Sequence, residues 1–113
     1  MAAATKHKVT RSSGNIFKDI GLPNADEHAL KADVVIRLSK LIESKGLSQA
    51  KAARLTGISQ PDLSRLLRGH FHGFSMDRLL QAFLALGSDV EIRVKKPVGD
   101  RPGTARVLSE AFA

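Results

Sequence analysis

A short stretch of this chain, GISQPDLSRLLRGHF at residues 57–71, combines a helical pattern with side chains that can hydrogen-bond to a partner. At 100° per residue, its three leucines share one face of a helix, and most of its polar side chains fall on the opposite face. Gln60 and Arg65 carry the donor and acceptor groups that pair with base edges in a major groove, where glutamine prefers adenine and arginine prefers guanine. The stretch therefore predicts a surface that reads base pairs.

Neighbouring residues are suited to contacts with phosphates, which set the register of a protein on DNA without reading its sequence. The expected DNA-binding set comprises Gln49, Ser59, Gln60, Pro61, Ser64, Arg65 and Arg68. Asp62 would repel phosphates, but its spacing from Ser59 is that of a capping box, so we expect it to stabilise the start of the helix. A solvated helical face without a ligand is the alternative interpretation of the two arginines.

The net charge of +7 and the pI of about 10.3 favour a polyanionic partner, either nucleic acid or an acidic protein. Positive charge is concentrated at residues 1–11 and 48–69, whereas residues 12–47 are balanced. Such an asymmetry is expected of a DNA-binding domain with a basic arm. A basic surface with no partner is the alternative.

Signals of catalysis or metal binding are absent from the sequence. There is no cysteine, and His70 and His72 stand without a cluster of other ligands, so no metal or cofactor is expected. No nucleophile lies beside a base and no glycine loop is suited to phosphates, so we expect no enzyme activity. No signal peptide or membrane span is recognisable, which predicts a cytoplasmic protein that does not contact membranes.

The hydrophobic periodicity predicts four helices. The first runs from Asn24 to about Gly46, and two short helices flank a turn at Gly57. The fourth follows Ser75 and ends near Gly87, and serines precede the last three helices as caps. The residues expected inside are Leu30, Val34, Leu38, Leu41, Ile42, Ala52, Leu55, Thr56, Ile58, Leu63, Leu66, Leu67, Leu79, Leu80, Phe83 and Leu84.

Residues 89–95 alternate strictly between apolar and charged side chains, which predicts a β-strand. A lone strand exposes unpaired backbone groups on both edges and needs a neighbour. We expect it to pair with the same strand of a second subunit, with Val90, Ile92 and Val94 as the dimerisation residues. A hairpin with a tail segment or a strand from another protein are the alternatives.

Three regions follow from these patterns within a chain of 113 residues, which is long enough for one small core. Residues 1–14 are expected to form a disordered basic arm, 15–96 the folded domain, and 97–113 a flexible tail. The apolar cluster between Ile16 and Leu22 is suited to covering the core or to binding a partner.

The stretch LSQAKAARLTGISQPDLSRLLRG resembles the Xre and lambda-repressor-like helix-turn-helix family. The residues at motif positions are Gln49, Ala53, Gly57, Ile58, Leu63 and Leu66. The resemblance implies an all-α bundle of about four to five helices, here with one C-terminal strand, in which the second helix of the motif enters the major groove. It also implies that Gln49 contacts a phosphate. We therefore expect a dimeric transcriptional repressor that binds double-stranded DNA at a palindromic operator.

Residues 13–95 as a whole resemble the small HigA-type antitoxins. That resemblance implies a RelE-like toxin as a possible partner and repression of the shared operon. The alternatives are a stand-alone or phage-type Xre regulator without a toxin, and a protein-interaction module in which the helix pair is only structural.

Overall fold

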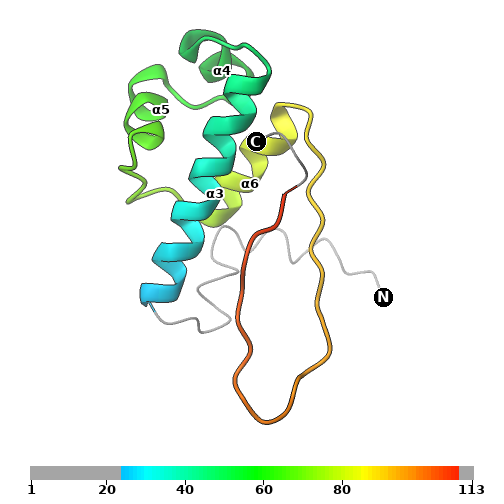
Figure 1. The fold of residues 1–113 in the computed structure, drawn as a ribbon. Coiled ribbons are helices and arrows are strands. Elements are labelled where there is room, and N and C mark those ends of the chain that lie inside the picture. The colour runs from blue at the N-terminus through cyan, green and yellow to red at the C-terminus, as the bar shows by residue number, and fades with distance from the viewer. Residues whose placement is uncertain (1–23, 110–113) are drawn as a thin grey trace.

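A long helix, α3 (Asn24–Ser44), crosses the computed structural model of the chain, which describes residues 24–109 (Figure 1). Three shorter helices follow it: α4 (Gln49–Thr56), α5 (Gln60–Leu67) and α6 (Met76–Ala85). Helices α5 and α6 pack against α3, and α4 packs mainly against α5 and α6. The expected all-α fold is confirmed for the described residues. The predicted arm at residues 1–14 and the Ile16–Leu22 cluster lie outside them.

The three short helices begin where the sequence predicts, because a serine caps each of them. Every cap residue has extended backbone geometry, and its hydroxyl accepts a hydrogen bond from a backbone N–H of the first turn. The bonds run to Ser48 from Lys51 at 3.1 Å, to Ser59 from Asp62 at 3.3 Å, and to Ser75 from Arg78 at 3.1 Å.

The turn between α4 and α5 depends on Gly57, whose φ of 77° lies in the left-handed region. Its N–H donates to the carbonyl of Ala53 at 2.9 Å and so closes α4. The side chain of Thr56 bonds back to the Ala52 carbonyl at 2.8 Å. Ile58 then enters the core at 4% exposure, which sets the angle between the two helices.

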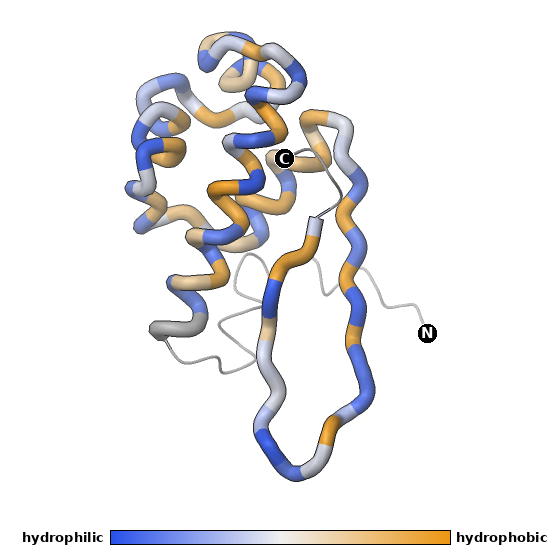
Figure 2. Tube along the Cα trace, viewed as in Figure 1, coloured by the Kyte–Doolittle hydropathy of each residue, from blue (hydrophilic) through white to orange (hydrophobic). Residues whose placement is uncertain are grey.

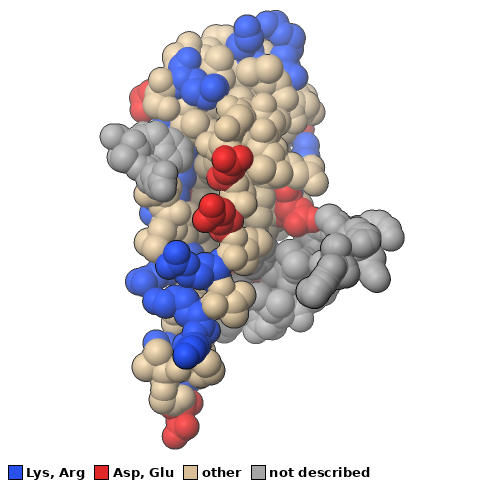
Figure 3. All heavy atoms as spheres, turned by 90° about the vertical axis from the view of Figure 1, so that its right-hand side faces the viewer, with Lys and Arg blue, Asp and Glu red and all other residues tan. Residues whose placement is uncertain are grey.

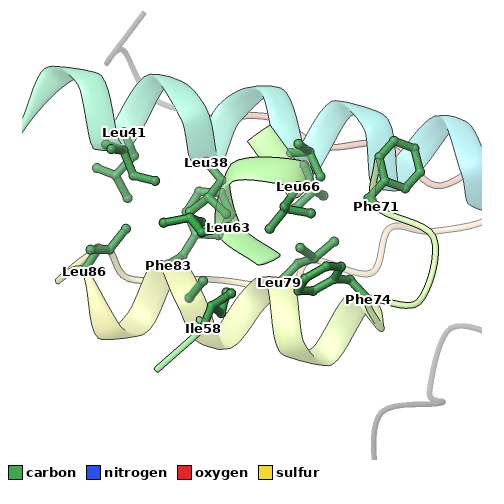
Figure 4. Packing of buried hydrophobic residues seen from close by; sticks show 14 of the residues in the cluster. Leu38, Leu41, Ile58, Leu63, Leu66, Phe71, Phe74, Leu79, Phe83 and Leu86 are labelled. Atoms are coloured by element: carbon green, nitrogen blue, oxygen red, sulfur yellow. The ribbon is translucent and has the colours of Figure 1, made fainter. Parts of the chain in front are cut away.

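The core lies between α3 and α6, and α5 inserts two leucines into it (Figure 4). Leu38 from α3, Leu63 and Leu66 from α5 and Leu79 from α6 are each fully buried. The loop between α5 and α6 adds the buried Phe71, whose ring centroid lies 4.8 Å from that of His28 on α3. Because all four helices contribute to one cluster, none of the short helices has to be stable alone.

Five expected core positions differ in the structure, among them Thr56, which is only partly buried. Leu55 and Leu84 are exposed at 44% and 55%, and Leu67 and Leu80 are only partly buried. The reason is geometric, since a helix at the edge of a small bundle buries a narrow stripe rather than every apolar residue. On α4 the small residues Ala52 and Ala53 make that stripe, and on α6 it is formed by Met76, Leu79, Ala82 and Phe83.

The predicted β-strand at residues 89–95 is wrong for the single chain. Residues 88–109 form an irregular C-terminal extension that leaves the bundle, turns near Gly99 and returns (Figure 1). A strand requires ladder hydrogen bonds, and within the described chain no backbone bond joins residues 89–95 to another segment. The alternating pattern is present, but no segment among residues 24–109 pairs with it.

The two ends of the extension return to the helices. Val90 and Val107 pack against the core, and Arg37 of α3 donates a hydrogen bond to the Ser109 hydroxyl. Between these points the chain has no helix or strand. That residues 97–113 form a flexible tail stays a prediction.

Candidate nucleic-acid interface

The two faces of α5 separate cleanly into a buried and an exposed set. Leu63 and Leu66 are fully buried, whereas Gln60, Pro61, Arg65 and Arg68 are exposed. The two leucines lie three residues apart and contact the core through successive turns, which fixes the rotation of the helix about its axis. The polar face is therefore held outward by the packing on its other side.

Helix α5 lies at the outside of the bundle, in contact with α3 and α4 (Figure 1). It has Pro61 in its first turn, where a missing N–H costs no helical hydrogen bond. Ser59 caps it through the N–H of Asp62, so the proline and the cap are compatible in one helix start. The exposed positions around this start are Ser59, Gln60 and Pro61.

Arg65 forms an ion pair with Asp62, three residues earlier on α5. The sequence predicts only a capping role for Asp62, although its i,i+3 spacing from Arg65 also permits this ion pair. The pair neutralises the carboxylate that would otherwise repel phosphates. The Arg65 side chain remains 53% exposed, so its guanidinium is accessible from outside.

A second arginine of α5 is oriented by a neighbour on the same helix. Arg68 donates a hydrogen bond from Nη1 to the hydroxyl of Ser64 at 2.9 Å, across one helical turn. Ser64 is partly buried and Arg68 is exposed. The two predicted phosphate-contacting side chains are therefore adjacent, at the end of α5 opposite to Gln60.

Gln49 is exposed at the first residue of α4, next to the capping residue Ser48. Helix N-termini carry free N–H groups and a partial positive charge, which favours anions such as phosphate. The structure brings the other six predicted residues together on or beside α5. Gln49 belongs to the neighbouring helix, and α4 and α5 pack against each other.

The loop between α5 and α6 carries the two histidines, His70 and His72, for which the sequence predicts no metal site. His70 and His72 are exposed on either side of the buried Phe71. Within residues 24–109, no group of three or more His, Cys, Asp and Glu side chains is arranged to hold a metal ion. The helices of this part of the chain also include none that is long and apolar enough to cross a membrane.

The short capped helices, the left-handed turn at Gly57 and the outward polar face of α5 define a helix-turn-helix protein. The chain belongs to the helix-turn-helix domain family, since the model of that family matches residues 16–95.

A solved structure described as "Putative XRE Family Transcriptional Regulator" is 38% identical to the chain, with a TM-score of 0.69. The similarity covers 79% of this chain and 99% of that one. It supports the placement among Xre-type helix-turn-helix proteins. No curated protein matches the chain.

Proposed function

We propose that this protein is a sequence-specific DNA-binding regulator of transcription that reads base pairs with α5. One observation carries the proposal: Leu63 and Leu66 are fully buried, while Gln60, Arg65 and Arg68 are exposed on the other side of the same helix. A helix held in this way can enter a major groove as a rigid unit. The similarity to a structure described as a transcriptional regulator supports the same function.

Within this function, Gln60 and Arg65 read base edges, and Gln49, Ser59, Ser64 and Arg68 hold phosphates. Pro61 lies at the exposed start of α5, where it contacts the groove wall. The ion pair with Asp62 does not prevent Arg65 from acting, because an exposed pair of this kind contributes only about 0.2–0.5 kcal/mol. A bidentate contact with guanine supplies about 1–3 kcal/mol of discrimination against other bases, so Arg65 can exchange this weak pair for a base.

The regulator acts as a homodimer on a palindromic operator, with half-sites about one helical turn apart. Val90, Ile92 and Val94 contribute to the dimer interface. Ile92 and Val94 are 72% and 90% exposed in the single chain, which is unusual for two apolar side chains so close in sequence. Figure 1 shows the extension on the side of the bundle away from α5, so a dimer formed there leaves both α5 helices uncovered.

The more specific proposal is that the protein is an antitoxin that neutralises a RelE-like toxin and represses the operon that encodes both. It is supported by the resemblance of residues 13–95 to HigA-type antitoxins. Co-expression of the protein with a RelE-like protein encoded beside it should rescue growth and yield a stable complex. If no such neighbour exists or growth is not rescued, the protein is a stand-alone regulator.

Replacing Arg65 with Ala tests the role of α5. The operator is first obtained by selecting bound duplexes from a random pool, and affinity is then measured by fluorescence anisotropy. We expect Arg65→Ala to weaken operator binding by about 1–3 kcal/mol, roughly 5- to 150-fold, and to relax the preference at one base pair.

Arg106→Ala is the matched control, because it removes the same side chain and charge from the exposed extension. We expect it to weaken binding only slightly and equally for all sequences. If the two variants bind the operator with the same affinity and preference, α5 does not read DNA, and a protein-interaction module becomes the better description.

A further inference from the structure

The charged residues at 89–95 follow a particular order in addition to alternating with apolar ones. The segment reads DVEIRVK, so the two acidic residues, Asp89 and Glu91, come first and the two basic residues, Arg93 and Lys95, come second. Ile92 stands at the midpoint. Reversing the direction of the segment therefore exchanges each acidic position with a basic one.

None of these four charged side chains is engaged within the described chain. All four are exposed, and no ion pair joins any of them to another residue of the described range. Figure 2 shows the alternation as hydrophobic and hydrophilic bands along the descending part of the extension. Figure 3 looks onto the side that carries the extension and shows acidic side chains with a group of Lys and Arg side chains below them.

We infer that residues 89–95 are an antiparallel, self-recognising dimerisation segment with a two-fold axis at Ile92. In this alignment Asp89 faces the partner's Lys95, and Glu91 faces the partner's Arg93. Val90 faces the partner's Val94, and the two Ile92 side chains meet at the axis. A two-fold interface repeats each contact, so every ion pair occurs twice.

The charge order selects this alignment over its competitors. Facing residues of opposite charge on neighbouring extended chains stabilise their pairing, and like charges in the same places destabilise it. A parallel alignment in the same register would place Asp89, Glu91, Arg93 and Lys95 each beside its own copy. A shift by one residue would bring charged side chains to the apolar face.

The backbone of this segment is also available for pairing. Its N–H and C=O groups make no bond to another described segment, and an extended chain with free groups on its edge is a template for a second chain. The second copy is the occupant that the charge order itself specifies. This inference rests on the homodimer of the proposed function and adds its orientation and register.

Two single charge reversals test the ion pairs. Glu91→Arg makes both central positions basic, and Arg93→Glu makes both acidic, so each variant repels itself in the antiparallel alignment. We expect each to raise the dimer dissociation constant about tenfold or more, measured by sedimentation equilibrium. Mixing the two variants should restore dimers, which native mass spectrometry will show to contain one chain of each kind.

The double variant Glu91→Arg/Arg93→Glu is the matched control, because it carries both changes but keeps the self-complementary order. It should dimerise as the unmodified protein does. Recovery in the mixture also shows that both single variants are folded. Unchanged dimerisation of the single variants, or no recovery on mixing, would overturn the inference.

Disulfide trapping tests the direction of the chains, and the absence of cysteine from the sequence makes each introduced thiol unique. In the antiparallel alignment Ile92→Cys should cross-link with itself. Val90→Cys and Val94→Cys should cross-link with each other when mixed, but neither with itself. Self-linking of Val90→Cys and Val94→Cys would show a parallel arrangement and contradict the proposal.

The same measurements separate this inference from the proposed function. A dimer that persists in every variant means that the interface lies elsewhere, while operator binding and the effect of Arg65→Ala stay intact. A monomeric unmodified protein that binds its operator as single chains would overturn both the dimer and its register. If the unmodified protein shows no specific DNA binding, the proposed function is overturned, while the dimer and its register still stand.

Discussion

At the scale of single residues, two short-range interactions orient the two arginine side chains on the outer face of α5. Asp62 holds Arg65, and Ser64 holds Arg68, each within one helical turn. Both arginines are exposed, so the pairings orient the guanidinium groups without burying them. Exposed pairs of this kind are weak, so under the proposed function the arginines would exchange these partners for bases and phosphates at little cost.

Gly57 is the residue on which the geometry of the motif depends most directly. Its φ of 77° is unfavourable for residues with a Cβ, yet an added Cβ would meet nothing within 4 Å. Gly57→Ala should therefore lower the free energy of unfolding by about 1–2 kcal/mol through backbone strain alone. Urea denaturation followed by circular dichroism measures this change.

Gly103→Ala is the control for that experiment, because the added Cβ also meets nothing but Gly103 has no left-handed φ. It should change the unfolding free energy by no more than about 0.5 kcal/mol. Equal effects of the two substitutions would show that the turn does not depend on the left-handed conformation.

At the scale of helices, the orientation of the polar face of α5 is a product of packing rather than of helix propensity. Helices α4 and α5 have eight residues each, which is too short for stability in isolation. Helix α5 is held because Leu63 and Leu66 enter the space between α3 and α6 (Figure 4). The same two side chains determine which residues face outward.

Leu66→Ala should destabilise the protein by about 2–5 kcal/mol, because it removes a fully buried side chain and leaves a cavity. Thermal and chemical denaturation measure the loss. Leu84→Ala makes the same change at a side chain that is 55% exposed, and it should cost no more than about 0.5 kcal/mol. Similar losses at both positions would mean that α5 is not anchored by its leucines.

At the scale of the whole molecule, the bundle separates two surfaces. Figure 1 shows α5 on one side of α3 and the C-terminal extension on the other. A dimer formed through the extension would leave both α5 helices uncovered. The proposed operator symmetry follows from the two-fold axis of such a dimer.

Inserting five base pairs between the two halves of the selected operator rotates one half-site by about half a helical turn. We expect affinity to fall to about that of a single half-site, as measured by anisotropy titration. The same five base pairs added outside the palindrome should have no effect. Full affinity for the internally lengthened operator would contradict a dimer with a defined half-site spacing.

The local features of this protein are determined by the sequence itself. Serine caps, the left-handed glycine and the leucine spacing of α5 act over a few residues, so the helix starts, the turn at Gly57 and the outer face of α5 could be predicted. The ion pair between Asp62 and Arg65 could also be predicted from the sequence, because residues three apart on one helix are neighbours.

Tertiary structure decided which apolar residues are covered. Leu55 and Leu84 are as apolar as Leu63, but only their position relative to neighbouring helices leaves them exposed. The strand predicted at residues 89–95 failed for the same reason, because alternation describes side chains while a strand requires hydrogen bonds to another segment. A helix closes its hydrogen bonds within itself, whereas burial and strand pairing depend on parts of the molecule that are distant in the chain.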